Sequence, residues 1–466
     1  MALRFYNTLT QQVEEFHPLH DHEVRMYTCG PTVYDFVHIG NLRTFTFQDI
    51  LRRWLRARGY RLNHVMNITD VDDRIIQGAQ AEGKSLAGFT ERYVQAFLED
   101  AATLRLERPE RIVRATGHIP EMVGLDQRLA ARGFTYESEG SVYFRISCFP
   151  GYGKLSHADF SGIRAGARVD TDKYEKEDAR DFVLWKARKE GEHYWETALG
   201  PGRPGWHIEC SAMSQKYLGD TLDIHTGGVD LIFPHHENEI AQSEGATGQP
   251  FVRWWLHAEH LMVDGQKMSK SLGNFYTLRD VLAKGYQPEA VRFLLVSVPY
   301  RNKLNFTFDG LQAAATAIDR LRNFELRLKT ERFPAGESLA QQEAIRSART
   351  AFEESMDDDL NTAGALGAVF EYVREANGAM DRGEFPAGNA AGALDLLARF
   401  DAVLDVLRPT AREGALGDSQ IEQLVAERNR ARMARDFARS DQVREQLLEQ
   451  GVLLEDTKEG TRWKRK

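Results

Sequence analysis

The pattern of apolar and polar positions near the N-terminus predicts a strand, a helix and a second strand. Residues 24–29 (VRMYTC) form a short, mostly apolar run that stops at a Gly-Pro pair, as a buried strand does. Residues 41–59 carry apolar side chains at helical spacing and end in glycine. Residues 62–68 are another apolar run, which ends at Thr-Asp. This βαβ order predicts a parallel sheet with a right-handed crossover connection.

The alternation breaks between residues 111 and 200 and then resumes. Two short runs, 134–136 and 142–144, flank a Glu-Gly turn and predict a hairpin within an inserted segment. We therefore predict one α/β domain, made of residues 1–110 and 201–287, that is split by an insertion of residues 111–200. The elements expected after the insertion are a helix near 206–217, a strand at 222–225, a helix opened by Pro234 and a strand at 259–263.

The C-terminal part of the chain has an almost wholly helical pattern. We predict a helical bundle over residues 288–408, with Asn361 as the N-cap of one helix, and a small C-terminal domain over residues 409–466. In that last domain Arg428, Arg432 and Arg435 have a spacing that would place them on one helix face, where they could meet phosphates or solvent. The bundle helices expected are 311–328, 362–379 and 393–407, and a short strand is expected at 451–454 before a turn at Gly460.

Composition narrows the class of protein. A length of 466 residues suggests two to four domains, and a net charge of −9 does not indicate a general nucleic-acid binder. We read the basic tail, residues 461–466, as a solvated terminus. No stretch is apolar enough to span a membrane or to act as a secretion signal. The three cysteines are sparse, which favours a reducing compartment, and we expect a cytoplasmic protein.

Two short motifs have the chemistry of a phosphate site. His38-Ile-Gly40-Asn41 stands between the first predicted strand and helix, where open α/β sheets bind ligands. The glycine lets a phosphate approach the backbone, and the imidazole can donate a hydrogen bond to it. Lys267-Met-Ser269-Lys270-Ser follows a predicted strand, and its lysines could neutralise a triphosphate. A structural loop histidine and a solvated basic loop are the alternatives for each motif taken alone.

A third group of residues could bind a metal. Cys29 ends the first strand, Cys210 lies on the helix near 206–217, and His235 and Glu239 are four positions apart on one helix face. Two thiolates, an imidazole and a carboxylate are a sensible zinc set, although two buried cysteines and a polar helix start explain the same residues. Three further residues compete as ligands: His225, His236 and Glu237. Cys148 has no assigned role, and we read it as structural.

Together the two phosphate motifs resemble the paired signatures of class I aminoacyl-tRNA synthetases. Within that class the chain is similar to the cysteinyl-tRNA synthetase family over nearly its whole length, including residues 454–457 (LEDT). The resemblance implies a doubly wound, Rossmann-like catalytic domain with an insertion, then a tRNA-binding helical bundle and an anticodon-recognition domain. The stretches that carry it are residues 28–35 (TCGPTVYD), 205–211 (GWHIECS) and 233–239 (FPHHENE).

The resemblance also implies the reaction and its participants. We expect L-cysteine to be activated with ATP and Mg²⁺ and then transferred to cysteine tRNA, tRNA(Cys), by a monomeric enzyme. One Zn²⁺ would select the substrate thiolate, because zinc binds sulfur better than a hydroxyl. Asn41 stands where the family often has a second histidine. The expected metal ligands are Cys29, Cys210, His235 and Glu239. The expected ATP contacts are His38, Gly40, Asn41, Asp230, Lys267, Ser269 and Lys270, of which His38, Lys267 and Lys270 are catalytic. The expected cysteine contacts are Cys29, Thr69 and Trp206.

Two other functions fit parts of this pattern. A cysteine ligase that passes cysteine to an amino-sugar resembles the catalytic part, but the long charged C-terminal region argues against it. A non-catalytic, zinc-containing RNA-binding protein would have no need of His38, Lys267 and Lys270.

Overall fold

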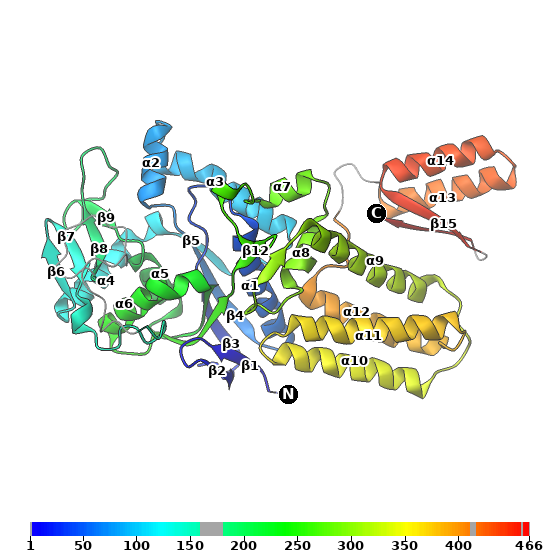
Figure 1. Ribbon diagram of the computed structural model, residues 1–466, viewed down its shortest axis with the longest axis horizontal. Helices are drawn as coiled ribbons and strands as arrows, with labels where there is room; N and C mark the ends of the chain where they lie inside the picture. The colour runs from blue at the N-terminus through cyan, green and yellow to red at the C-terminus, as the bar shows by residue number, and fades with distance from the viewer. Residues whose placement is uncertain (1, 159–179, 411–415, 458–459, 466) are drawn as a thin grey trace. The chain divides into compact units, whose positions relative to one another are not determined.

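A computed structural model of the chain describes residues 2–158, 180–410, 416–457 and 460–465 (Figure 1). The chain divides into two compact units, Met1–Asp405 and Val406–Lys466. Within the described ranges, no helix combines the length and apolar character that crossing a bilayer requires.

A five-stranded parallel sheet forms the centre of the first unit, which confirms the predicted fold class. The order β11-β10-β3-β4-β5 places β3 in the middle, so the chain moves outward first to one edge and later to the other. This reversal is the topological switch point at which doubly wound sheets bind ligands. The strands are β3 (Glu23–Thr28), β4 (Arg61–Ile68), β5 (Arg111–Arg114), β10 (Leu222–Gly228) and β11 (Val252–Ala258).

The sequence prediction of the last sheet strand was wrong. β11 had not been expected, because almost all of its residues are buried and it therefore lacks the alternation of a half-exposed strand. The strand expected at 259–263 is the shorter β12 (Leu261–Val263). It belongs to a separate three-stranded sheet with β13 (Gln266–Lys267) and β14 (Leu304–Phe306).

Helices that follow the strands cover the sheet. The predicted first helix is α1 (Ile39–Ala57), which contacts β4 and β10. It begins two residues earlier than expected because the side chain of His38 caps it. After β4 come α2 (Asp73–Ala81) and α3 (Leu86–Thr103), and the predicted helix near 206–217 is α5 (Ile208–Leu218).

The inserted segment packs onto the same core as the sheet. The predicted hairpin is β6 (Thr135–Ser138) with β7 (Ser141–Phe144), and β8 (Phe182–Ala187) and β9 (Gly202–Pro204) extend it to four antiparallel strands. Phe144 and Trp185 share one buried cluster with residues of the central sheet. The helix α4 (Ile119–Ala131) contacts α5 and α6 (Glu237–Thr247), the helices that carry Cys210 and Glu239.

Five α-helices, α8 to α12, lie within residues 288–404, and they include the three bundle helices that were predicted. Asn361 caps α11 as expected, because its side chain accepts from the backbone N–H of Gly364. α10 had not been predicted, since its buried residues Ala348, Phe352 and Met356 form only a thin apolar stripe in a polar helix. The helices are α8 (Pro288–Val296), α9 (Phe308–Thr330), α10 (Leu339–Asp357), α11 (Thr362–Asp381) and α12 (Ala390–Leu404).

The second unit has its own small core under a hairpin. It consists of α13 (Asp418–Met433), α14 (Phe437–Glu449) and the predicted strand as β15 (Val452–Thr457), paired with β16 (Gly460–Arg465). The predicted three-arginine helix face was wrong. Arg428 is buried in a two-point contact with Asp456, Arg432 binds the same carboxylate, and Arg435 lies beyond the helix end with positive φ.

Candidate functional site

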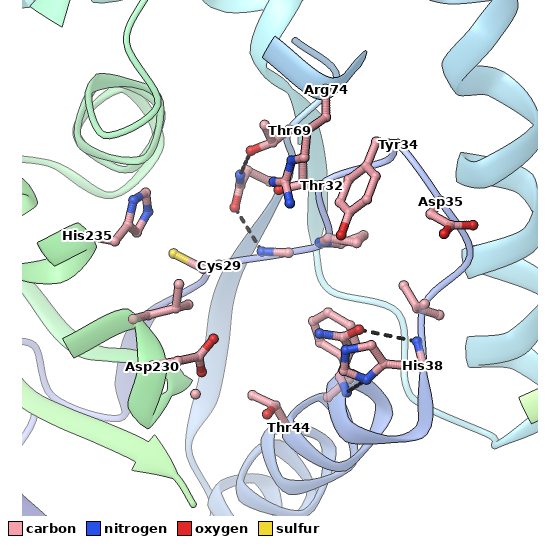
Figure 2. Close-up of a pocket in the computed structure, with 18 of the residues that line it drawn as sticks. Cys29, Thr32, Tyr34, Asp35, His38, Thr44, Thr69, Arg74, Asp230 and His235 are labelled. Atoms are coloured by element: carbon pink, nitrogen blue, oxygen red, sulfur yellow. Dashed lines mark hydrogen bonds between the residues drawn. The ribbon is translucent and has the colours of Figure 1, made fainter. Parts of the chain in front are cut away.

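A pocket of about 340 Å³ opens at the carboxyl ends of the central strands and beside the amino end of α1. In Figure 2, Cys29 and His235 lie at one end of this pocket, and His38 and Asp35 lie at the other. The pocket thus occupies the switch point of the sheet, where the sequence predicted a ligand site. Of the predicted site residues, those that line it are Cys29, His38, Asn41, Thr69, Trp206, Cys210, Asp230, His235 and Lys270.

Four buried side chains of metal-binding type meet at the first end. The Sγ atoms of Cys29 and Cys210 are 3.6 Å apart, and both cysteines are free thiols. Glu239 Oε1 lies 3.6 Å from Cys29 Sγ and 3.0 Å from His235 Nε2. One donor atom from each of the four lies within 4.8 Å of the others. Two thiols, an imidazole and a carboxylate at this spacing fit a zinc ion.

The local fold explains how distant residues converge there. Cys29 follows β3, and the next residue must be glycine because a Cβ on Gly30 would lie 1.8 Å from the carbonyl oxygen of Asn67. Cys210 lies in the first turn of α5. His235 and Glu239 meet across one turn, as their four-residue spacing predicted, with Nε2 and Oε1 3.0 Å apart. The α-helix itself begins at Glu237, however, and not at Pro234, which lies in the wider turn Ile232–His236 before it.

The electrostatics of this cluster favour a cation. Burial alone would raise the pKa of Glu239, but the neighbouring His225 and His235 lower it to about 2. Burial would likewise raise the pKa of the Cys210 thiol, whereas hydrogen bonds from Cys29 and His235 lower it to about 6. These two groups, Glu239 and Cys210, in turn raise the pKa of His235 to about 10, whereas burial raises the pKa of the Cys29 thiol. The buried carboxylate and thiolate character of the cluster is therefore stabilised by a neighbouring positive charge.

The competing ligands are distinguished by whether they line the pocket. A second group, Cys29 with His225, His236 and Glu239, also has donor atoms within 4.8 Å of one another. Contacts of the kind that His235 makes with Glu239 and His207 are also made by these two histidines: His225 Nε2 lies 2.8 Å from Glu239 Oε2, and His236 Nδ1 lies 2.8 Å from His257 Nε2. Neither histidine lines the pocket, whereas Cys210 and His235 do. The first group is thus the one that borders the space available to a substrate.

Glu237 is excluded as a ligand by its own hydrogen bonds. Its carboxylate accepts from the backbone N–H groups of Gly153, Leu155 and Ser156. It therefore fixes a loop of the insertion against α6. Cys148, which the sequence suggested to be structural, is exposed at the end of a short turn and does not line the pocket.

At the other end, His38 and Asn41 form a reciprocal helix cap. His38 Nδ1 accepts from the backbone N–H of Asn41, and Asn41 Oδ1 accepts from the backbone N–H of His38. Because Nδ1 is the acceptor, a neutral ring carries its proton on Nε2, which is then a donor. Burial lowers the pKa of His38 and favours this neutral form. Asn41 thus has a structural task that needs no positive charge.

The lysine-rich loop, residues 267–271, lies at the same end of the pocket. Lys270 lines the pocket and forms an ion pair with Asp35. The hydrogen bond between the two side chains raises the pKa of Lys270. Lys267 is exposed on β13, and the hydroxyl of Ser269 lies 2.6 Å from that of Ser271. Neither of these two lines the pocket. Gly40 also lies outside the lining, and a Cβ there would be 3.2 Å from the terminal methyl of Met268 in the loop.

Side chains between the two ends complete the pocket. Thr69 donates to buried Glu209 at 2.8 Å and accepts from Asn67. Trp206 is 39% exposed, and its ring centroid lies 4.4 Å from that of His235, so the tryptophan forms a wall and not part of the core.

Sequence reasoning missed several lining residues, among them Asn67, Arg74 and Tyr34. The guanidinium of Arg74 lies 4.0 Å from the ring centroid of Tyr34. Position directly after a predicted strand could have pointed to Asn67, whereas no pattern distinguishes Arg74.

Comparisons with known proteins show the family of the chain. A family model described as tRNA synthetases class I (C) catalytic domain matches residues 15–316, and one described as DALR domain matches residues 351–408. The chain is 66% identical over 466 residues to a cysteine–tRNA ligase of Solibacter usitatus, and 52% identical over 499 residues to one of Koribacter versatilis. Both matches cover 100% of each chain.

Solved structures share the fold at low identity. Methionyl-tRNA synthetase of Mycobacterium tuberculosis bound by methionyl-adenylate has a TM-score of 0.64 and 16% identity, and the match covers 82% of this chain and 92% of that one. A putative arginyl tRNA synthetase from Campylobacter jejuni has a TM-score of 0.56 and 13% identity, with coverage of 85% and 94%.

Proposed function

Because the chain belongs to the cysteinyl-tRNA synthetase family of class I tRNA synthetases, we propose that its pocket binds L-cysteine and ATP and attaches cysteine to tRNA(Cys). The cysteine carboxylate attacks the α-phosphorus of ATP, which forms cysteinyl-adenylate and releases pyrophosphate. A hydroxyl of the terminal tRNA ribose then attacks the adenylate carbonyl, and AMP leaves. One observation carries the proposal: a single pocket has buried metal-type donors at one end and His38 with Lys270 at the other.

At the first end we assign one zinc ion to Cys29, Cys210, His235 and Glu239. When bound there, zinc supplies a soft Lewis acid that prefers the thiolate of cysteine to the hydroxyl of serine. The chain's own residues orient the ligands, since His225 lies 2.8 Å from Glu239 Oε2 and His207 Nδ1 lies 2.9 Å from His235 Nδ1. Such outer partners fix the orientation of metal ligands.

Beside the metal ligands, Thr69 and Trp206 would contact the rest of the cysteine substrate. The hydroxyl of Thr69 is held by Glu209 and Asn67, so it is oriented before a substrate arrives. Trp206 stands next to His235 and would limit the size of the side chain that fits. A shaped pocket alone separates cysteine from serine poorly, which is why the metal is needed for selectivity.

At the other end, chain residues would stabilise charge on the phosphates. The Nε2–H of His38 would donate to a phosphate oxygen, and the ammonium of Lys270 would neutralise charge as pyrophosphate leaves, with Mg²⁺ bound to ATP. Asp230 would accept from ATP hydroxyls. Lys267 and Ser269 do not line the pocket, so their contacts with ATP require the loop to close over the phosphates.

The remaining parts of the proposal concern tRNA and the state of the protein. The helices from residue 288 onward and the C-terminal unit would bind tRNA(Cys), with the second unit at the anticodon. We also propose a monomer in the cytoplasm, because the family resemblance implies a monomer and charged tRNA is used where proteins are made.

Transfer of labelled cysteine to purified tRNA(Cys), with ATP and Mg²⁺, tests the activity. Acid-precipitable counts that depend on ATP, and that serine at equal concentration does not replace, are the expected result. Cysteine-dependent pyrophosphate exchange without charging of tRNA would point instead to transfer of cysteine to another amine, such as an amino-sugar. Folded, zinc-loaded protein that catalyses neither reaction would indicate a non-catalytic RNA-binding protein.

A further inference from the structure

Two residues that line the pocket, Arg74 and Tyr34, have no part in the ATP and cysteine contacts proposed above. Figure 2 shows both on the side of the pocket that connects the end with Cys29 to the end with His38. Among the described lining residues, Arg74 and Lys270 are the only arginine and the only lysine. Because Lys270 is assigned to the phosphates of ATP, Arg74 is the cation that remains for another anion.

Arg74 is held in place but keeps most of its hydrogen-bonding capacity. Its Nε donates at 3.0 Å to Asp72, the N-cap of α2, and its guanidinium lies 4.0 Å from the ring centroid of Tyr34. Its two terminal nitrogens make no hydrogen bond to any described residue, and the side chain is 53% exposed. The N–H donors of these two nitrogens suit the paired oxygens of a phosphate.

Tyr34 presents an aromatic ring from a fixed segment of backbone. Thr32 forms a parallel bridge with Thr69, in which the N–H of the buried Val33 donates to the carbonyl of Thr69 at 3.1 Å. The ring of Tyr34 is 38% exposed and has the guanidinium of Arg74 on one face. Single-stranded ends of nucleic acids are bound by such pairs, because a base stacks on the ring and a phosphate binds the cation.

The position of this pair matches the route that tRNA must take. Cysteinyl-adenylate would have its sulfur at the metal-type residues and its phosphate near His38, so its carbonyl would lie between the two ends. The ribose hydroxyl of tRNA must reach that carbonyl from a side that ATP and cysteine leave open. Arg74 is poorly suited to the cysteine carboxylate instead, because a bound guanidinium would withdraw charge from the oxygen that attacks ATP.

We propose that Arg74 and Tyr34 form the subsite for the terminal adenosine of tRNA. Arg74 binds the phosphate that precedes this nucleotide, and Tyr34 stacks on its base. The inference rests on the proposed function, since it names where one of the substrates binds. In the transfer step, the ribose oxygen forms an ester bond to the carbonyl carbon as the bond from that carbon to the phosphate oxygen breaks. AMP keeps the electron pair of the broken bond and accepts the hydroxyl proton.

Two assays separate activation from transfer. Cysteine-dependent pyrophosphate exchange without tRNA measures activation alone, and charging at varied tRNA(Cys) concentration gives kcat/KM for tRNA. Arg74→Gln should lower kcat/KM for tRNA at least about tenfold and leave the exchange rate within about twofold of wild type. Arg74→Lys, which keeps the charge but not the two-point contact, should lie between them. An equal loss of exchange and charging would place Arg74 at ATP or cysteine and overturn the inference.

The stacking contact is tested at Tyr34. Tyr34→Phe keeps the ring and should charge tRNA at close to the wild-type rate, whereas Tyr34→Leu should lower kcat/KM for tRNA about fivefold or more. The exchange rate of both variants should stay near wild type. Wild-type charging by Y34L would refute the stacking.

Arg92→Gln is the matched control. Arg92 also lies over a tyrosine, Tyr93, at 4.5 Å from the ring centroid, and pairs with Glu82, but it does not line the pocket. Its kcat/KM for tRNA should equal that of wild type, and a decrease as large as that in R74Q would indicate a general effect of surface charge and overturn the inference.

Binding of a shortened tRNA(Cys) that lacks the terminal adenosine tests the contact directly. Wild type should bind full-length tRNA more tightly than the shortened one, and Arg74→Gln should reduce this difference about tenfold. An undiminished difference would overturn the inference. Absence of charging by the wild-type protein would overturn the proposed function as well, whereas charging by wild type and R74Q at equal rates would overturn this inference alone.

Discussion

The ammonium of Lys270 is bound to the carboxylate of Asp35, a residue 235 positions earlier in the chain. Asp35 belongs to the loop after β3 and Lys270 to the lysine-rich loop, and both line the pocket. The proposed phosphate-binding cation therefore already has an anionic partner. Binding of ATP would exchange the carboxylate of Asp35 for phosphate oxygens, so Asp35 competes with the substrate.

The substitution Asp35→Asn should therefore lower the KM for ATP. An exposed ion pair contributes about 0.2–1 kcal/mol, which limits the decrease to roughly fivefold. Lys270→Ala should instead lower kcat in pyrophosphate exchange by tenfold or more, because it removes charge stabilisation in the transition state. Initial rates at varied ATP concentration give both quantities.

The double variant is the control for this interaction. If Asp35 acts through Lys270, Asp35→Asn should leave the KM for ATP unchanged once Lys270 is alanine. An equal decrease in KM with and without the lysine would show that the aspartate acts on ATP by another route.

The two candidate ligand groups make different predictions for zinc content. Cys210→Ala should abolish tight zinc binding, measured as metal per chain by elemental analysis after dialysis. His236→Asn should retain about one zinc per chain, since His236 lies behind the pocket and is bonded to His257. Loss of a ligand typically removes most of the affinity of a four-ligand site, whereas loss of an outer partner lowers it by 10–100-fold at most.

The reverse pattern, zinc retained in C210A and lost in H236N, would assign the ion to the second group. Circular dichroism spectra that match the wild type should accompany either result, so that a loss of metal is not confused with unfolding. Chelation of the wild-type protein should likewise abolish cysteine activation, and added Zn²⁺ should restore it.

Much of the sheet could be predicted from sequence because β3, α1 and β4 have clear periodicity and end at Gly-Pro, glycine and Thr-Asp. β11 could not be predicted, because a strand that is buried on both faces does not alternate between polar and apolar residues. Its two tryptophans would be equally at home in any buried segment. The Pro234 helix was placed too early, because proline suits the first turn of a helix but does not say where regular α-helix begins.

For the site, residue type and spacing made Cys29, Cys210, His235 and Glu239 a possible metal set, and the family resemblance favoured them, but neither excluded Glu237. That exclusion depends on three backbone N–H donors from a loop about 80 positions earlier in the chain. The capping role of Asn41 was equally inaccessible, because it depends on the φ and ψ angles of His38.

Gly40 provides a test of contact between α1 and the lysine-rich loop. A Cβ on Gly40 would lie 2.9 Å from His38 Nδ1 and 3.2 Å from the terminal methyl of Met268. Gly40→Ala should therefore displace the imidazole and lower the pyrophosphate-exchange rate by about tenfold or more, since small misplacements of reacting groups have large effects. The thermal midpoint should change little, because the crowded atoms belong to side chains that can move.

Gly124→Ala on α4 is the matched control. No atom lies within 4 Å of a Cβ at that position. The exchange rate should stay at the wild-type value, and the thermal midpoint should stay equal or rise slightly, because alanine favours helix by about 0.5–1 kcal/mol. A wild-type exchange rate in G40A would argue that the loop and α1 do not need this close contact.

The contact between Arg52 and Glu110 predicts how stability depends on pH. Burial would raise the pKa of Glu110, but hydrogen bonds from Arg52 and from the backbone of His64 lower it from 4.5 to about 2. Above pH 4.5 the carboxylate is ionised in both the folded and the unfolded chain, and its stabilisation is complete. As the pH falls toward 2 the unfolded chain takes up the proton first, so the stabilisation is progressively lost.

Glu110→Gln should accordingly lower the thermal midpoint at neutral pH by a few degrees, which corresponds to about 1 kcal/mol once the partial exposure of the side chain is considered. The difference from wild type should shrink between pH 5 and pH 3. Glu99→Gln serves as control, because Glu99 pairs with Arg279 at the exposed surface and its loss should have little effect throughout. A wild-type advantage over E110Q that is as large at pH 3 as at pH 7 would contradict the role of Arg52, since a protonated Glu110 would then stabilise the fold as well as the carboxylate does.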